Sequence, residues 1–171
     1  MSMIKRLLRN SLLIAGLTIT VFTVEAQNGS YIANHKAMAI VLSRTYGIPA
    51  PLILAVAAIE SSGGKGPVAK VLNNHFGIEG RNNYVTKNGF RSRYKQYSNV
   101  FASYLDFCKL LSHKRFYHKL KNNTDCIAWV KAMSHCHYSE VPEEWEQKVL
   151  SMLAIIKSQS KKEALPLLAI R

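Results

Sequence analysis

One carboxylate stands out in this chain because of its surroundings. Glu60 ends a nearly uncharged apolar segment, and it is the only ionisable group between Gly47 and Gly64. Two serines and two glycines follow it directly, a composition that ends a helix. The carbonyl end of a helix disfavours negative charge and apolar neighbours solvate it poorly, so the pKa of Glu60 should be raised. Such a carboxyl group can act as a general acid, which is what glycosidic bond cleavage needs.

Two blocks of sequence give this carboxylate a context. Residues 46–61 read YGIPAPLILAVAAIES, and residues 73–78 read NNHFGI. Taken alone, Glu60 could also be a solvated glutamate at a helix end. The two blocks, in this order and spacing, resemble the glucosaminidase family of peptidoglycan hydrolases, family 73 of the glycoside hydrolases, over about residues 33–158. The resemblance implies that Glu60 is the catalytic acid.

The resemblance also implies roles for further side chains. The segment HYSEVP, residues 137–142, stands where family members carry a tyrosine that lines the cleft near the reacting sugar. We carry that role to Tyr138, which would orient the acetamido group of the sugar or stabilise developing positive charge. Trp145 stands, after one extra residue, where relatives usually have a tyrosine. The predicted substrate-binding residues are Asn73, Asn74, His75, Phe76, Tyr97 and Trp145.

A second catalytic carboxylate is harder to assign. Many longer relatives place one in a hairpin, but residues 81–105 contain no acid here. Glu79 is the nearest candidate for a catalytic base, at a position that is often lysine in relatives. The 2-acetamido oxygen of the substrate can itself attack the anomeric carbon, as in substrate-assisted glycosidases. We therefore expect Glu60 and the acetamido group to carry the reaction, with Glu79 as the alternative base.

The hydrophobic periodicity predicts a mostly helical protein with one hairpin. We expect helices over residues 31–46, 49–61, 67–72, 98–111 and 124–133, and from 142 to about 161. The pair Asn88-Gly89, between two short strand-like runs, predicts a β-hairpin with a type I′ turn. The fold class is therefore α+β and predominantly helical, compatible with a lysozyme-like fold that carries a small β-hairpin lobe.

The first 26 residues differ in kind from the rest of the chain. Three basic residues precede an apolar run over 12–24, and residues 24–26 read VEA, a small-residue cleavage pattern. This predicts a signal peptide over 1–26 and a single glucosaminidase domain over 27–171. A transmembrane anchor is the alternative, but the apolar run is shorter than the ~18 to 20 residues that a span requires.

The charge of the chain bears on its partners. The net charge is +13, and loss of the first 26 residues, with three bases and one acid, leaves +11. Nucleic acid, an anionic membrane or an anionic wall polymer could attract such a protein, and the charge could also serve solubility alone. Export and the lack of a nucleic-acid-binding motif favour the wall. We predict a monomer that binds peptidoglycan glycan strands, without nucleic acid or stable membrane insertion.

The cysteine and histidine patterns predict no cofactor. Cys108, Cys126 and Cys136 are an odd number for an oxidising compartment, so one disulfide plus a free thiol and three buried thiols are both compatible. His135 and His137 flank Cys136, but this spacing matches neither C-x-x-C nor H-E-x-x-H. We therefore predict neither a metal nor another cofactor.

Together these observations favour an endo-β-N-acetylglucosaminidase that acts as an autolysin or wall-remodelling enzyme, secreted or periplasmic and associated with the bacterial envelope. It would cleave β-1,4 N-acetylglucosaminyl bonds of peptidoglycan with Glu60 as the general acid. A lytic transglycosylase is the alternative in the same class, because its signature also places Glu-Ser at a helix end. A wall-binding module without catalysis is the alternative in another class, because the hairpin is short and lacks an acid.

The first prediction concerns export. We expect cleavage after Ala26, because the preceding basic and apolar segments end in a small-residue pattern. Protein recovered from the envelope fraction should then begin at Gln27 in N-terminal sequencing or intact-mass measurement. Recovery of chains that retain Met1 would contradict the prediction.

Overall fold

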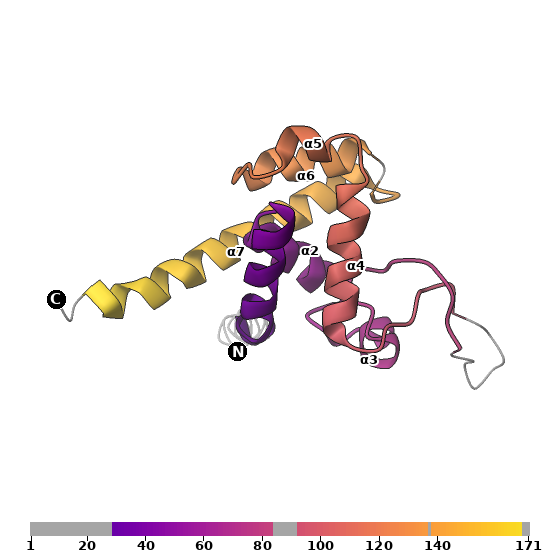
Figure 1. Cartoon of the computed structure of the whole chain (residues 1–171). Coiled ribbons are helices and arrows are strands. Elements are labelled where there is room, and N and C mark those ends of the chain that lie inside the picture. Colours follow the sequence, from indigo (N-terminus) through magenta and orange to yellow (C-terminus); the bar gives the residue numbers. More distant parts are fainter. Residues whose placement is uncertain (1–28, 84–91, 137, 169–171) are drawn as a thin grey trace, which may run out of the picture.

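The computed structural model describes residues 29–83, 92–136 and 138–168, and Figure 1 shows the course of the chain. A helix over 29–46 precedes α2 (Ala50–Glu60). The remaining helices are α3 (Pro67–Leu72), α4 (Val100–Ser112), α5 (Tyr117–Leu120), α6 (Cys126–His135) and α7 (Pro142–Leu168). The described part of the chain is therefore predominantly helical, as the sequence predicts.

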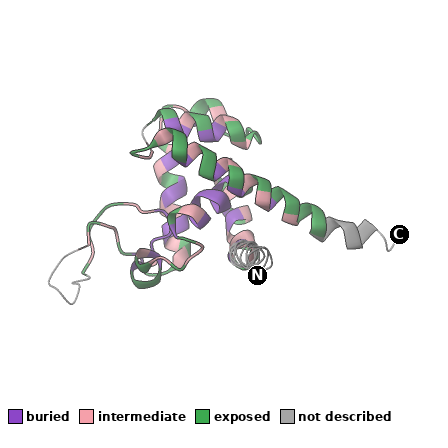
Figure 2. Cartoon of the chain, turned by 180° about the vertical axis from the view of Figure 1, so that it is seen from behind, coloured by how far each residue is buried: buried purple, intermediate pink, exposed green. Residues whose placement is uncertain are grey.

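Helix α2 forms the centre of the fold. Residues 52–58 are all buried, as expected for a helix that is apolar around its whole circumference. Helix α7 packs across α2 and also against α6, and α4 contacts α2 as well. Trp129, Tyr104 and Phe107 are among the fully buried side chains of this core. Figure 2 shows the buried residues gathered in the middle of the molecule, with exposed residues along the outer side of α7.

The turn into α2 depends on a glycine. Gly47 has a φ of +66°, where a side chain would strain the backbone, and a Cβ there would collide with Asn122. Its N–H donates to the carbonyl of Ser43, and its own carbonyl accepts from the N–H of Asn122. Proline is tolerated in the first turn of the helix that follows, because the N–H that it lacks would have no helical partner. The predicted boundary between the first two helices is confirmed.

The predicted β-hairpin lobe is not seen in the described residues, where an isolated antiparallel bridge joins Glu79 to Tyr94. Backbone hydrogen bonds from Gly80 to Arg93 and from Lys95 to Ile78 flank this bridge. The side-chain amide of Asn82 donates to two carbonyls of the opposite segment, so a side chain takes the place of regular ladder bonds. The expected Asn88-Gly89 turn lies outside the described residues.

Some helix bounds differ from the predicted ones. Asn99, and not Ser98, caps α4, because its Oδ1 accepts a hydrogen bond from the N–H of Ala102 at 2.9 Å. Helix α5 was not expected, because four residues are too few to show a period. Helix α7 continues past Lys161 to Leu168. Its extension follows from good helix formers in the segment KKEAL, residues 161–165, and not from an apolar stripe.

The predicted signal peptide over 1–26, and the alternative of a membrane anchor there, lie outside the described residues. Within the described ranges, no helix is both long and apolar enough to cross a membrane. Cys108, Cys126 and Cys136 are all free thiols. Of the three, Cys108 is buried and Cys136 is exposed, so neither the single disulfide nor the three buried thiols describes the structure.

Candidate active site

Glu60 is the last residue of α2, and the chain turns sharply after it. Ser62, Gly63 and Gly64 have φ values of +52°, +61° and +76°, which end the helix. The N–H of Gly63 donates back to the carbonyl of Ala58 at 2.7 Å and fixes the turn. The carboxylate of Glu60 therefore lies at the C-terminal end of the buried helix α2.

The indole of Trp145 holds this carboxylate. Trp145 lies in the first turns of α7, is 5% exposed, and donates its Nε1–H to Oε1 of Glu60 at 2.8 Å. Although Glu60 itself reaches the surface, protein crowds its carboxyl group, and this loss of solvation raises its pKa. The hydrogen bond from Trp145 and the positive charge of Lys148 partly oppose the rise. The carboxyl group is therefore oriented and shifted toward its protonated form.

Tyr138 lies beside this pair. Its ring is 5.1 Å from that of Trp145 and meets the edge of Phe107 at 6.1 Å. Its hydroxyl is buried and has no hydrogen-bond partner among the residues that the structure describes. Burial, and then the charge of Glu60, raises the pKa of Tyr138 well above its ordinary value. The neutral hydroxyl therefore keeps a free donor close to the carboxylate.

A loop and a tyrosine border the other side of Glu60. Gly77 has a φ of +64°, and a Cβ there would lie 3.8 Å from Oε2 of Glu60 and 3.8 Å from Cε1 of Tyr94. Any larger residue would therefore strain the backbone, although its Cβ would make only an ordinary van der Waals contact with the carboxylate. Sequence reasoning missed both residues, although the glycine stands in the NNHFGI block and the tyrosine in the RYKQY segment.

The two asparagines of the NNHFGI block organise the loop. Asn74 is buried, and its amide donates to the carbonyls of Ile78 and Lys95 at 2.8 Å each. Its Oδ1 accepts from the N–H groups of Phe76 and Ile78. Asn73 adopts a left-handed conformation and donates to the carbonyl of Tyr97 at 3.1 Å. The predicted sugar contacts of both residues remain untested, and their amides are engaged within the protein.

His75 and Phe76 point into the protein. His75 is 5% exposed, and its Nδ1 pairs with the hydroxyl of Tyr31 at 2.7 Å. Burial, and then the nearby imidazole of His35, lowers the pKa of His75 to about 4. Phe76 stacks on Phe107 with ring centroids 4.1 Å apart. Their predicted role as substrate contacts also remains untested.

Tyr97 belongs to a polar cluster at the base of the bridged segment. Its hydroxyl donates to Oδ2 of Asp106 at 2.7 Å, and Nζ of Lys95 approaches the same oxygen at 2.7 Å. Burial alone would raise the pKa of Asp106, but the hydrogen bonds from Lys95 and Tyr97 outweigh it and hold that pKa below its ordinary value. Asp106 is thus a charged partner of this cluster, and it ties α4 to the bridged segment.

Glu79 lies on the exposed surface. Its Oε1 is 3.1 Å from Nε of Arg93, and both side chains are more than half exposed. The charge of Glu140 also acts on Arg93. The segment after α6 therefore lies within electrostatic reach of the bridged segment. Glu140 is a carboxylate that sequence reasoning did not consider, because the fold alone brings it there.

Within the described ranges, no group of three or more His, Cys, Asp or Glu side chains lies together. Oε1 of Glu60 accepts an indole N–H from Trp145, and an indole N–H cannot coordinate a cation.

Solved structures share this fold. The glycoside hydrolase domain of FlgJ from Salmonella typhimurium is similar with a TM-score of 0.67 and 22% identity, covering 83% of this chain and 96% of that chain. The peptidoglycan hydrolase from Sphingomonas sp. A1 is similar with a TM-score of 0.62 and 20% identity, covering 78% of this chain and 94% of that chain. The catalytic domain of the autolysin Auto from Listeria monocytogenes is similar with a TM-score of 0.61 and 20% identity, covering 75% of this chain and 83% of that chain. Among curated proteins, none matches this chain significantly.

The fold is therefore that of glycoside hydrolase domains, and a carboxyl group with a raised pKa lies at the end of its central helix α2. The family described as "Glucosaminidase: Mannosyl-glycoprotein endo-beta-N-acetylglucosaminidase" matches residues 36–158. The chain belongs to this Glucosaminidase family. The matched range includes Glu60, Tyr138 and Trp145.

The hydrogen bond from Trp145 generates a prediction about the acid itself. An N–H donor stabilises the charged carboxylate, so its removal in Trp145→Phe should raise the pKa of Glu60 further. The carboxyl carbon of Glu60 can be followed by NMR titration of protein labelled at glutamate. Trp129→Phe is the control, since that indole donates to the carbonyl of Asn123 instead. An unchanged or lowered pKa of Glu60 in Trp145→Phe would disprove the role of the hydrogen bond.

Proposed function

We propose that this protein is an exported endo-β-N-acetylglucosaminidase that hydrolyses β-1,4 N-acetylglucosaminyl bonds of peptidoglycan. The observation that carries the proposal is the carboxyl group of Glu60, crowded by protein and bonded to the Trp145 indole at 2.8 Å. Membership of the Glucosaminidase family and the shared fold with proteins named peptidoglycan hydrolase and autolysin support it. The net charge of +11 that remains after loss of the first 26 residues suits a substrate rich in carboxylates.

Glu60 acts as the general acid in this proposal. A raised pKa keeps a larger fraction of the group protonated at a given pH, and that proton passes to the leaving glycosidic oxygen as the bond to the anomeric carbon breaks. The Trp145 N–H engages Oε1, so that Oε2, on the side of Gly77, is left to face the substrate. Holding the carboxyl group in one orientation lowers the entropic cost of proton transfer.

The acetamido group of the substrate supplies the nucleophile. A retaining carboxylate pair would stand ~5 to 5.5 Å apart, and a second carboxylate at that distance would raise the pKa of Glu60. Burial raises that pKa and Trp145 and Lys148 lower it, and the proposal therefore assigns no second carboxylate to the reaction. Attack by the acetamido oxygen forms a cyclic intermediate, which water opens as Glu60 takes back a proton. The proposal assigns a hydrogen bond to the acetamido group during this attack to the hydroxyl of Tyr138, which has no partner among the described residues.

Export and location follow from the same proposal. The substrate lies outside the cytoplasm, which agrees with the signal peptide predicted over 1–26. We propose a secreted or periplasmic monomer that stays on the wall through its basic charge. No cofactor takes part in the mechanism.

Replacing the acid tests the proposal. Glu60→Gln keeps the shape of the side chain but cannot deliver a proton, so release of muropeptides from purified sacculi should fall by ~10² to 10⁴. Because burial penalises the charged form of Glu60, the amide should leave the thermal midpoint at pH 7 no lower than in the wild type. Glu143→Gln, a change at an exposed acid of α7, is the control. Near wild-type release by Glu60→Gln would remove this residue from the reaction.

Replacing the alternative base tests the mechanism. Glu79→Gln should keep most of the activity, because Glu79 is bonded to Arg93 on the exposed surface. Glycan strands from which the N-acetyl groups have been removed should not be cut, because they lack the nucleophile. If Glu79→Gln were folded but as inactive as Glu60→Gln, and the product formed with inverted anomeric configuration, Glu79 would be the base and substrate assistance would be wrong.

A further inference from the structure

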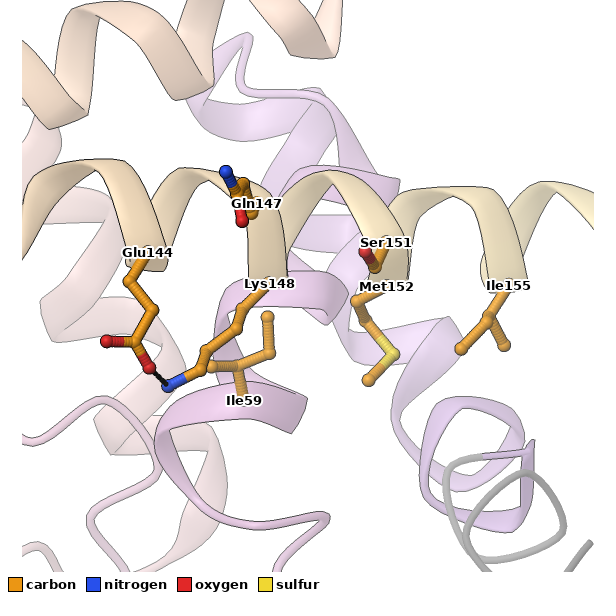
Figure 3. Close-up of a pocket in the computed structure, with 7 residues that line it drawn as sticks. All are labelled: Ile59, Glu144, Gln147, Lys148, Ser151, Met152 and Ile155. Carbon is orange, nitrogen blue, oxygen red and sulfur yellow. Dashed lines mark ion pairs between the residues drawn. The ribbon is translucent and has the colours of Figure 1, made fainter. Parts of the chain in front are cut away.

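A groove of about 430 Å³ runs along α7 beside the candidate acid (Figure 3). Its apolar floor consists of Ile59, Met152 and Ile155, and Gln147 and Ser151 also line it. An ion pair between Lys148 and Glu144, with Nζ and Oε1 2.6 Å apart, lies at one end. None of these residues has a part in the reaction proposed above, except that the charge of Lys148 acts on Glu60.

The groove begins where the chemistry is proposed. Ile59 directly precedes Glu60 in α2, and Trp145, which bonds Glu60, directly follows Glu144 in α7. The charge of Lys148 lowers the pKa of Glu60, so this end of the groove is within electrostatic reach of the acid. From Glu144 to Ile155 the helix advances ~16 Å, which matches an extended peptide of about five residues. A ligand in the groove would therefore be a short chain that starts beside the scissile bond.

Peptidoglycan carries such a chain. Each muramyl sugar, which follows the N-acetylglucosamine in the bond cleaved here, bears a short peptide stem on its lactyl group. The stem combines alanine methyl groups with free carboxylates and an amine. An apolar floor next to a Lys148–Glu144 pair offers a matching surface, because the lysine can bond a carboxylate and the glutamate can bond an amine.

We propose that the α7 groove binds the peptide stem of peptidoglycan, with Lys148 facing a stem carboxylate and the floor of Ile59, Met152 and Ile155 receiving methyl groups. The inference rests on the proposed function, since it places the stem beside the bond that Glu60 would cleave. It makes the enzyme selective for glycan that carries stems.

A charge placed in the groove tests the inference. Ser151 is exposed and lines the groove, so Ser151→Glu should repel the stem carboxylates, whereas Ser151→Lys should not. Ala154 is exposed on the same helix outside the groove lining, and Ala154→Glu is the matched control for charge. The activity of each folded variant is measured on intact peptidoglycan and on glycan strands from which an amidase has removed the stems.

We expect Ser151→Glu to raise the KM for intact peptidoglycan by roughly fivefold and to leave the KM for stem-free strands unchanged. Ser151→Lys and Ala154→Glu should not raise either value. If the wild type cuts the substrates but Ser151→Glu behaves as Ala154→Glu does on both, the groove does not bind the stem, and the proposed hydrolysis stands. If the wild type cuts neither substrate, the proposed function fails, and the inference fails with it.

Discussion

The hydrogen bond from Trp145 to Glu60 is the interaction on which the candidate site depends. It joins the last residue of α2, the buried helix at the centre of the fold, to the first turns of α7, which packs across that helix. Burial raises the pKa of the acid while the indole and Lys148 limit the rise. The same contact therefore fixes the orientation of the carboxyl group and limits how far its pKa is raised.

An aromatic row connects this contact to the core. Phe76 stacks on Phe107, Phe107 meets Tyr138, and Tyr138 lies against Trp145, with ring centroids 4.1, 6.1 and 5.1 Å apart. Rings packed in this way have few alternative rotamers, so they hold the phenol and the indole in place. On the other side, the four hydrogen bonds of Asn74 hold the loop that brings Gly77 up to the acid. A rigid shell thus surrounds a carboxylate that remains open on one side.

How far the sequence predicts this site depends on the range of the contacts. The end of α2 at Glu60 is predictable because a run of apolar residues and the following Ser and Gly residues are local signals. The role of Trp145 cannot be predicted in this way, because its partner Glu60 lies 85 positions away in the sequence. From the sequence alone, this tryptophan is as readily interpreted as a surface that stacks on a sugar. Asn74 has the amide of a sugar-binding residue, and its use inside the loop is decided by tertiary contacts. The predicted hairpin is not seen in the described residues, and its expected turn lies outside them.

Mass spectrometry of the products that the mature protein releases from purified sacculi tests the central claim most directly, because it reports activity and bond choice together. A hydrolase with Glu60 as its acid predicts soluble muropeptides with a reducing N-acetylglucosamine end. Products with an anhydro-muramyl end would show a lytic transglycosylase instead. Binding to the sacculi without release of any muropeptide would show a wall-binding module, and either result would contradict the account.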